Sequence, residues 1–94
     1  MHPITRKTLR TFWKQKLHSR TALERWSKII TSNNFDNFTQ LRATFPSADL
    51  VGKLTFFNIG RNKYRLIAAI HFNRHKVYIR HILTHAEYDK NNWK

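Results

Sequence analysis

The sequence contains no cysteine, so disulfide frameworks and thiolate metal sites are excluded. This absence fits a reducing compartment. The chain also lacks an apolar run long enough to span a bilayer, and Met1-His2-Pro3 is nothing like the start of a signal peptide. We therefore expect a cytoplasmic protein that has no membrane partner.

Acidic side chains are scarce, with five Asp and Glu against eighteen Lys and Arg. The five are Glu24, Asp36, Asp49, Glu87 and Asp89. They are too few and too scattered for a two-metal nuclease, which needs several converging carboxylates. The six histidines show no compact metal-ligand spacing, and the chain has no glycine-rich phosphate loop, nucleophilic cysteine or evident serine triad. We expect neither a metal nor another cofactor.

Basic residues, by contrast, are spread along the whole chain and give a formal net charge of +13. Such an excess suits a polyanion, with nucleic acid as the first candidate and an acidic protein as the second. Hydrophobic residues make up 40% of the chain and aromatic residues 14%, which excludes a merely disordered basic tail. At 94 residues we expect one small domain, 1–94, with a modest core.

The first half of the sequence predicts three helices after a short edge strand at His2 to Ile4. The first helix begins near Lys7, Ser19 is a candidate N-cap for the second, and Pro46 stops the third. Apolar residues repeat at helical spacing in each: Leu9, Phe12, Trp13, Leu17; Ala22, Leu23, Trp26, Ile29, Ile30; Phe38, Leu41, Phe45. We expect the first two helices to form an antiparallel pair laid on a sheet.

The second half predicts three strands, at residues 51–58, 63–72 and 76–84. A tight turn centred on Arg74 and His75 would pair Phe72 with Val77, Ile70 with Ile79 and Ala69 with Arg80. One face then holds Arg65, His71, Tyr78, Arg80 and Thr84. The other holds Leu66, Ile70, Phe72, Val77, Ile79 and Leu83. His81 also falls on this apolar face, where a partly buried imidazole is the ordinary outcome. The register of the upstream strand stays open between two pairings.

A capping box is predicted at the end of the last strand, where Thr84-His85-Ala86-Glu87 has the required spacing. His85 is then the first helical residue, and Tyr88 lies on the same side of the helix. Both would stand at a helix N-terminus, where free amides favour a phosphate.

This cluster of Arg, His and Tyr suits metal-free RNA cleavage, in which the 2′-hydroxyl of the substrate attacks the adjacent phosphorus. Arg65 and Arg80 are the candidates for stabilising the phosphorane, because guanidinium groups stay charged and bind phosphate oxygens in pairs. His85 is the candidate acid or base, and Tyr88 would donate a hydrogen bond, position the nucleophile or stack on a base.

Each candidate also has a plainer interpretation. The two arginines could be solvated strand residues, although their shared face favours function. The two interpretations of His85 are about even, and tyrosines at such positions more often serve packing. Further cations and a histidine are predicted to bind RNA without catalysing its cleavage: Lys53, Arg61, Lys63, His71 and Arg74.

Two stretches, FNIGRNKYRLIAAIHF and VYIRHILTHAEYDK, closely resemble the HigB-type toxins of the RelE superfamily of bacterial toxin–antitoxin modules. The segments MHPITRKTLRTFWKQ and LRATFPSADLVG are similar to the same family, so the resemblance covers nearly the whole chain. It implies an α+β fold with N-terminal helices packed on a small antiparallel sheet and a short C-terminal helix. It also implies ribosome-dependent cleavage of translated mRNA and neutralisation by a helix-turn-helix antitoxin of the HigA type.

By position, Arg65 and Arg80 match strand arginines with which the superfamily holds the scissile phosphate, and His85 and Tyr88 match its C-terminal His and aromatic positions. The family commonly has Gly-Gly-Asn where this chain has Gly60-Arg61-Asn62, a change expected to add phosphate affinity at a turn.

We therefore predict an mRNA-cleaving toxin that acts on the ribosome. The alternative is a non-catalytic RNA- or ribosome-binding module that inhibits translation. A sequence-specific DNA-binding protein is disfavoured, because no recognition helix is evident, and DNA binding is expected only through the antitoxin complex.

Overall fold

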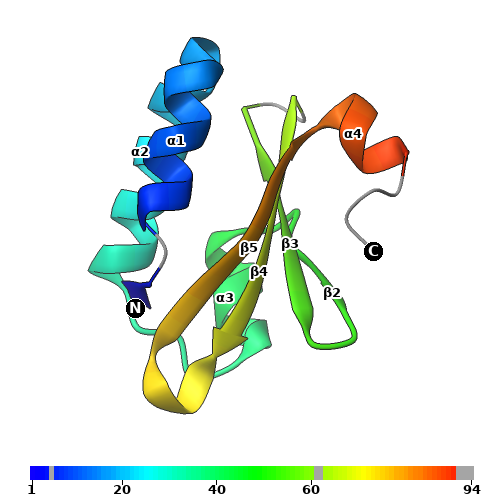
Figure 1. Cartoon of the computed structure of the whole chain (residues 1–94). Helices are drawn as coiled ribbons and strands as arrows, with labels where there is room; N and C mark the ends of the chain where they lie inside the picture. Colours follow the sequence, from blue (N-terminus) through cyan, green and yellow to red (C-terminus); the bar gives the residue numbers. More distant parts are fainter. Residues whose placement is uncertain (5, 61–62, 91–94) are drawn as a thin grey trace.

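The computed structural model describes residues 1–4, 6–60 and 63–90 as an α+β fold (Figure 1). A five-stranded sheet has the strand order β1-β5-β4-β3-β2. The elements are β1 (His2–Pro3), α1 (Arg6–Gln15), α2 (Arg20–Ser32), α3 (Phe38–Thr44), β2 (Asp49–Val51), β3 (Leu54–Ile59), β4 (Tyr64–His71), β5 (Lys76–Thr84) and α4 (His85–Asp89). Two short 3-10 turns, Leu17–Ser19 and Phe72–Arg74, complete the description. The predicted fold class is confirmed.

Helices α1 and α2 run alongside each other on one side of the sheet, and α4 lies on the other side (Figure 1). The 3-10 turn Leu17–Ser19 separates α1 from α2. Ser19 is the N-cap residue of α2, as predicted, but its side chain makes no capping hydrogen bond: the hydroxyl is buried and donates instead to the carbonyl of Lys16, at 2.6 Å. The serine therefore closes the preceding turn.

The sheet is antiparallel except at β1, the predicted edge strand, which pairs parallel with the start of β5. The strand predicted at residues 51–58 is confirmed as β3 over residues 54–58, but its start is wrong, because Val51 belongs to β2 and a two-residue turn at Gly52 and Lys53 joins β2 and β3 into a hairpin. Gly52 has a φ of +61° and stands first in the turn, a position that favours glycine in such hairpins.

The predicted register between β4 and β5 is also wrong. Ile70 pairs with Val77 and Ala68 with Ile79, which is a shift of two residues near the turn. The connection is longer than predicted because a 3-10 turn at Phe72–Arg74 precedes His75, which takes a left-handed φ of 54°. A shift of two residues preserves which side chains share a face. For that reason the predicted sorting of core and polar residues survives in this half of the hairpin.

A β-bulge changes the alternation further along β5. Ala68 pairs with Ile79 and Ile67 with His81, so Arg80 and His81 together oppose Ile67. The residues flanking this pair, Ile79 and Ile82, both belong to the core, whereas Arg80 and His81 are exposed. The predictions that His81 and Leu83 share the apolar face are therefore wrong, because the extra residue moves Ile82 onto that face.

The core lies between the sheet and the helices. It is formed chiefly by alternate residues of β3, β4 and β5 and by the apolar stripes of the helices: Leu9, Leu23, Trp26, Ile30, Leu41, Phe57, Ile59, Leu66, Ala68, Val77, Ile79 and Ile82. Its other buried members are Met1, Phe35, Ala48 and Tyr64. No helix among the described residues has the length and apolarity needed to cross a membrane.

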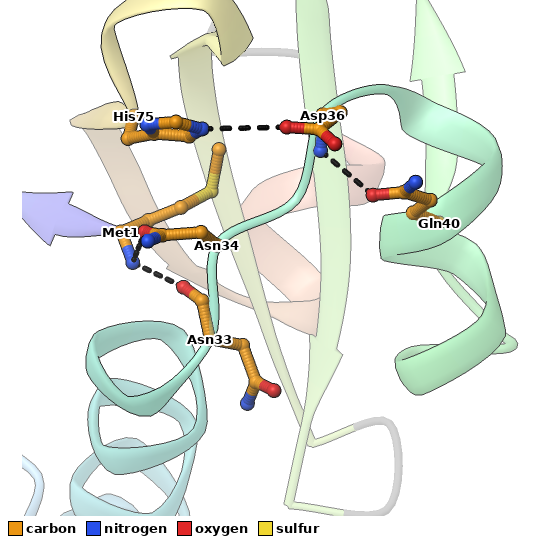
Figure 2. Close-up of polar contacts among 6 residues, drawn as sticks. All are labelled: Met1, Asn33, Asn34, Asp36, Gln40 and His75. Carbon is orange, nitrogen blue, oxygen red and sulfur yellow. Dashed lines mark hydrogen bonds and ion pairs between the residues drawn. The ribbon is translucent and has the colours of Figure 1, made fainter.

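The Met1 ammonium group ties the start of the chain to the end of α2 (Figure 2). It donates to the carbonyl of Ile30 at 2.8 Å, to the side chain of Asn34 at 3.1 Å and to the carbonyl of Asn33. Burial lowers the pKa of this amino group. The amides of His2 and Ile4 donate to the carbonyls of His75 and Val77 and hold β1 beside β5.

Candidate functional site

The sheet face that carries α4 is cationic and holds the candidate catalytic residues. Arg65 lies on β4, the middle strand, between core-facing Tyr64 and Leu66. Alternation along the strand therefore directs its side chain away from the core. Arg65 pairs with Asn58 of β3 and Leu83 of β5, so the neighbouring strands flank it on both sides.

Tyr88 of α4 packs over this arginine. The guanidinium carbon of Arg65 lies 4.9 Å from the centre of the Tyr88 ring, within cation–π range. The same ring meets Phe56 of β3 edge to face, with centroids 6.0 Å apart. Phe56 is itself buried, and it pairs with buried Ile67 on this face of the sheet. A small apolar floor thus supports Tyr88, which in turn positions Arg65.

Arg65 retains a donor without a partner. Its Nε atom is buried and has no hydrogen-bond partner among the described residues. A buried, unpaired N–H of a charged group is costly. Asn58, the cross-strand neighbour of Arg65, likewise has a buried side-chain oxygen without a partner among the described residues. The Arg65 side chain as a whole is only half-buried, so an anionic oxygen has access to part of the guanidinium.

Arg80 lies on the same face, at the bulge. It opposes Ile67, which is two residues from Arg65 along β4, so the two arginines are displaced by about 7 Å along the strand direction. Arg80 is exposed, and the exposed His81 beside it shares the bulge. The structure therefore brings both predicted arginines to one surface, as the sequence indicated.

Helix α4 begins where the sequence predicts, and the capping box is confirmed. The Thr84 hydroxyl accepts from the amide of Glu87 at 3.2 Å, and the Glu87 carboxylate accepts from the amide of Thr84 at 2.9 Å. His85 is the first helical residue, and its amide donates to the carbonyl of Lys63 at 3.2 Å. The bond to Lys63 fixes the start of α4 against the start of β4.

The imidazole of His85 is itself held on α4. Its Nδ1 lies 3.1 Å from Oδ2 of Asp89, one helical turn later. Sequence reasoning missed this contact, although the four-residue spacing after a predicted helix start was a signal for it.

Part of the stability that the capping box contributes should depend on pH. The hydrogen bond from the Thr84 amide holds the pKa of Glu87 below its usual value. The carboxylate therefore stabilises the fold at neutral pH, and this contribution is lost as the pH falls through the lowered pKa. We expect Thr84→Ala to cost about 1 kcal/mol.

The matched variant Glu87→Gln should unfold with a flatter dependence on pH than the wild type. Chemical unfolding at neutral pH and at pH about 3 would measure both effects. Equal acid sensitivity of wild type and Glu87→Gln would contradict the capping assignment.

The five predicted RNA-binding residues do not form one cluster. Lys63 is exposed beside the start of α4, whereas Lys53, His71 and Arg74 are exposed at the opposite end of the sheet. His71 lies on the same sheet face as Arg65, about 20 Å away along β4, and its ring packs edge to face against Tyr78. Arg61 lies outside the described residues. Within the described residues, no group of three or more His, Cys, Asp or Glu is arranged to hold a metal ion.

Comparison with known proteins identifies the family of the chain. Residues 19–91 match the family described as HigB_toxin, the RelE-like toxic component of a toxin-antitoxin system. The chain is 36% identical over 92 residues to the mRNA interferase toxin HigB of Escherichia coli (strain K12), covering 95% of this chain and 88% of that protein. The mRNA interferase HigB of Shigella flexneri gives the same values. The mRNA interferase HigB of Escherichia coli O6:H1 is 29% identical over 93 residues, covering 96% of this chain and 90% of that protein.

The α+β fold and the match over most of the chain define the class: this is a RelE-like toxin of a toxin–antitoxin system. Within that class, the chain belongs to the HigB toxin family.

Proposed function

We propose that this protein is an mRNA interferase, a metal-independent endoribonuclease that cleaves translated mRNA on the ribosome. The observation that carries the proposal is the half-buried guanidinium of Arg65, which packs against Tyr88 on the same sheet face as Arg80. Guanidinium groups stay charged and bind phosphate oxygens in pairs, so these two arginines suit a scissile phosphate. The names of the relatives, mRNA interferase HigB, support the same activity.

In the proposed reaction the 2′-hydroxyl of the substrate attacks the adjacent phosphorus. A bond forms between the 2′-oxygen and phosphorus, and the bond from phosphorus to the 5′-oxygen breaks. The proton leaves the 2′-oxygen for a base, and an acid supplies a proton to the departing 5′-oxygen. Arg65 and Arg80 stabilise the charge that develops on the phosphorane oxygens.

His85 serves in proton transfer, and Tyr88 contacts the RNA while holding Arg65 in place. The exposed cations Lys53, Lys63 and Arg74, together with His71, extend the binding surface along the sheet. Because RNA bound along this face meets few groups able to orient it, the ribosome supplies the geometry of the substrate. Residues 1–94 act as one toxin domain in the cytoplasm.

The partner that neutralises the toxin is proposed to be a co-expressed antitoxin of the HigA type with a helix-turn-helix domain. Membership of a toxin–antitoxin family supports such a partner. DNA binding is then a property of the toxin–antitoxin complex. In a gel shift with operator DNA, the toxin alone should leave the DNA unshifted.

The test is primer extension on a well-translated reporter mRNA after brief induction of the wild type and of Arg80→Ala. Loss of charge-assisted hydrogen bonds to the phosphate should reduce cleavage by Arg80→Ala about 10- to 100-fold. Cuts should lie within the translated frame and disappear when initiation is blocked. If growth stops while the message stays intact, the protein inhibits translation by binding alone and the nuclease proposal fails.

A further inference from the structure

Both acids of α4 have definite partners. Glu87 is occupied by the capping box, where it accepts from the amide of Thr84. Asp89 is the other acid, and its Oδ2 lies 3.1 Å from Nδ1 of His85. Since the cap fixes where α4 begins, the four-residue spacing places His85 and Asp89 on one side of the helix.

The position of Asp89 is not explained by helix stability. It is the last residue of α4, where the helix dipole disfavours a negative charge. The chain has only five acidic residues in all, against eighteen basic ones. An acid at an unfavourable end of a short helix, in contact with a candidate catalytic histidine, points to a role in the reaction.

The contact determines which imidazole nitrogen is available to the substrate. An ionised carboxylate only accepts hydrogen bonds, so Nδ1 of His85 must be the donor. In the neutral ring the proton therefore resides on Nδ1, and Nε2 carries the free lone pair. Whether His85 takes a proton from the 2′-oxygen or gives one to the 5′-oxygen, that proton moves through Nε2.

We propose that Asp89 is a positioning residue that fixes the tautomer and orientation of His85 for proton transfer. This inference rests on the proposed function. It assigns Asp89 no contact with the RNA, since it acts through the imidazole.

The solvent exposure of His85 and Asp89 distinguishes a role in catalysis from a role in stability. The side chains of His85 and Asp89 are 54% and 62% exposed, so the contact adds little to stability in the free protein. When RNA covers the site and excludes water, the same hydrogen bond becomes stronger. The effect of losing the carboxylate should thus appear in cleavage and not in unfolding.

The experiment compares Asp89→Asn, Asp89→Glu, His85→Ala and the double variant His85→Ala/Asp89→Asn with wild type in ribosome-dependent cleavage of a defined mRNA. Asp89→Asn should cut about 10- to 100-fold more slowly, less than the loss of roughly 10⁴ when a buried Asp that orients a catalytic imidazole is replaced, because this pair is exposed. Asp89→Glu, which keeps the carboxylate, should recover part of this loss. The double variant should cleave mRNA at the same rate as His85→Ala, because Asp89 affects cleavage only through His85.

A spectroscopic measurement tests the pair without cleavage. Nitrogen chemical shifts of the His85 ring should show the Nδ1–H tautomer in the wild type and a mixture of tautomers in Asp89→Asn, with unchanged midpoints of thermal unfolding. Full cleavage activity of Asp89→Asn, or an unchanged tautomer, would overturn the positioning role alone. A wild type that cuts no mRNA would overturn the proposed function, and the role of Asp89 in it.

Discussion

Replacement of Arg65 by alanine should reduce mRNA cleavage about 100- to 1,000-fold, the loss expected when a donor aimed at a developing oxyanion is removed. Arg65 is the central cation of the site, because it lies on the middle strand and carries the buried unpaired Nε–H. Its guanidinium also contacts the Tyr88 ring at 4.9 Å. A quantitative cleavage assay on programmed ribosomes would measure the change.

Two further variants separate chemistry from charge. Arg65→Lys keeps the charge but loses the planar fork that binds phosphate in pairs, so it should recover only a small part of the activity. Arg42→Ala removes the same group from an exposed site on α3 and should cleave like the wild type. If Arg65→Ala and Arg42→Ala lose the same activity, the effect is one of net charge and Arg65 has no special role.

Leu66→Ala should lower the free energy of unfolding by about 2 to 5 kcal/mol. Leu66 is fully buried on β4, where it pairs with Phe57 on one side and Ile82 on the other. Truncation leaves a cavity in the middle of the only sheet that the described residues form, and its lining can collapse little because both neighbouring strands hold it. Small domains have total stabilities of about 5 to 15 kcal/mol, so the loss is a large share of the whole.

The matched control is Leu50→Ala on the edge strand β2. Leu50 is 50% exposed, so the same deletion there should change the free energy of unfolding by about 0.5 kcal/mol or less. Urea denaturation of both variants gives the comparison directly. Similar losses for the two would mean that β4 is not the packed centre of the protein.

Much of the fold could be predicted from local patterns. Helical spacing of apolar residues located α1, α2 and α3, and the Thr84 capping box located the start of α4, because these signals depend on neighbours within a turn. The β4–β5 register could not be predicted, since it depends on a 3-10 turn and a left-handed His75. The hairpin of β2 and β3 was missed because Gly52 was read as part of a strand.

The sequence predicted which residues share the polar face of the sheet, but it did not predict how their side chains contact one another. The alternation of side chains along β4 placed Arg65 on the polar face. The predicted register was wrong by two residues, and a shift of two keeps each side chain on its face, so Tyr78 and Arg80 were still predicted there. The packing of Tyr88 on Phe56 and Arg65 joins α4 to two strands. Such a contact depends on how α4 folds back over the sheet, which no local spacing reveals.

The bulge in β5 also has a consequence for how chain length can vary among relatives. Loss of one residue inside a strand ordinarily turns every following side chain to the wrong face. Here Arg80 and His81 share one position against Ile67, so loss of His81 would restore regular alternation and leave Ile79 and Ile82 both in the core. The bulge in β5 is thus a place where a one-residue deletion is tolerable, and a gap in an alignment there would not signal a different fold.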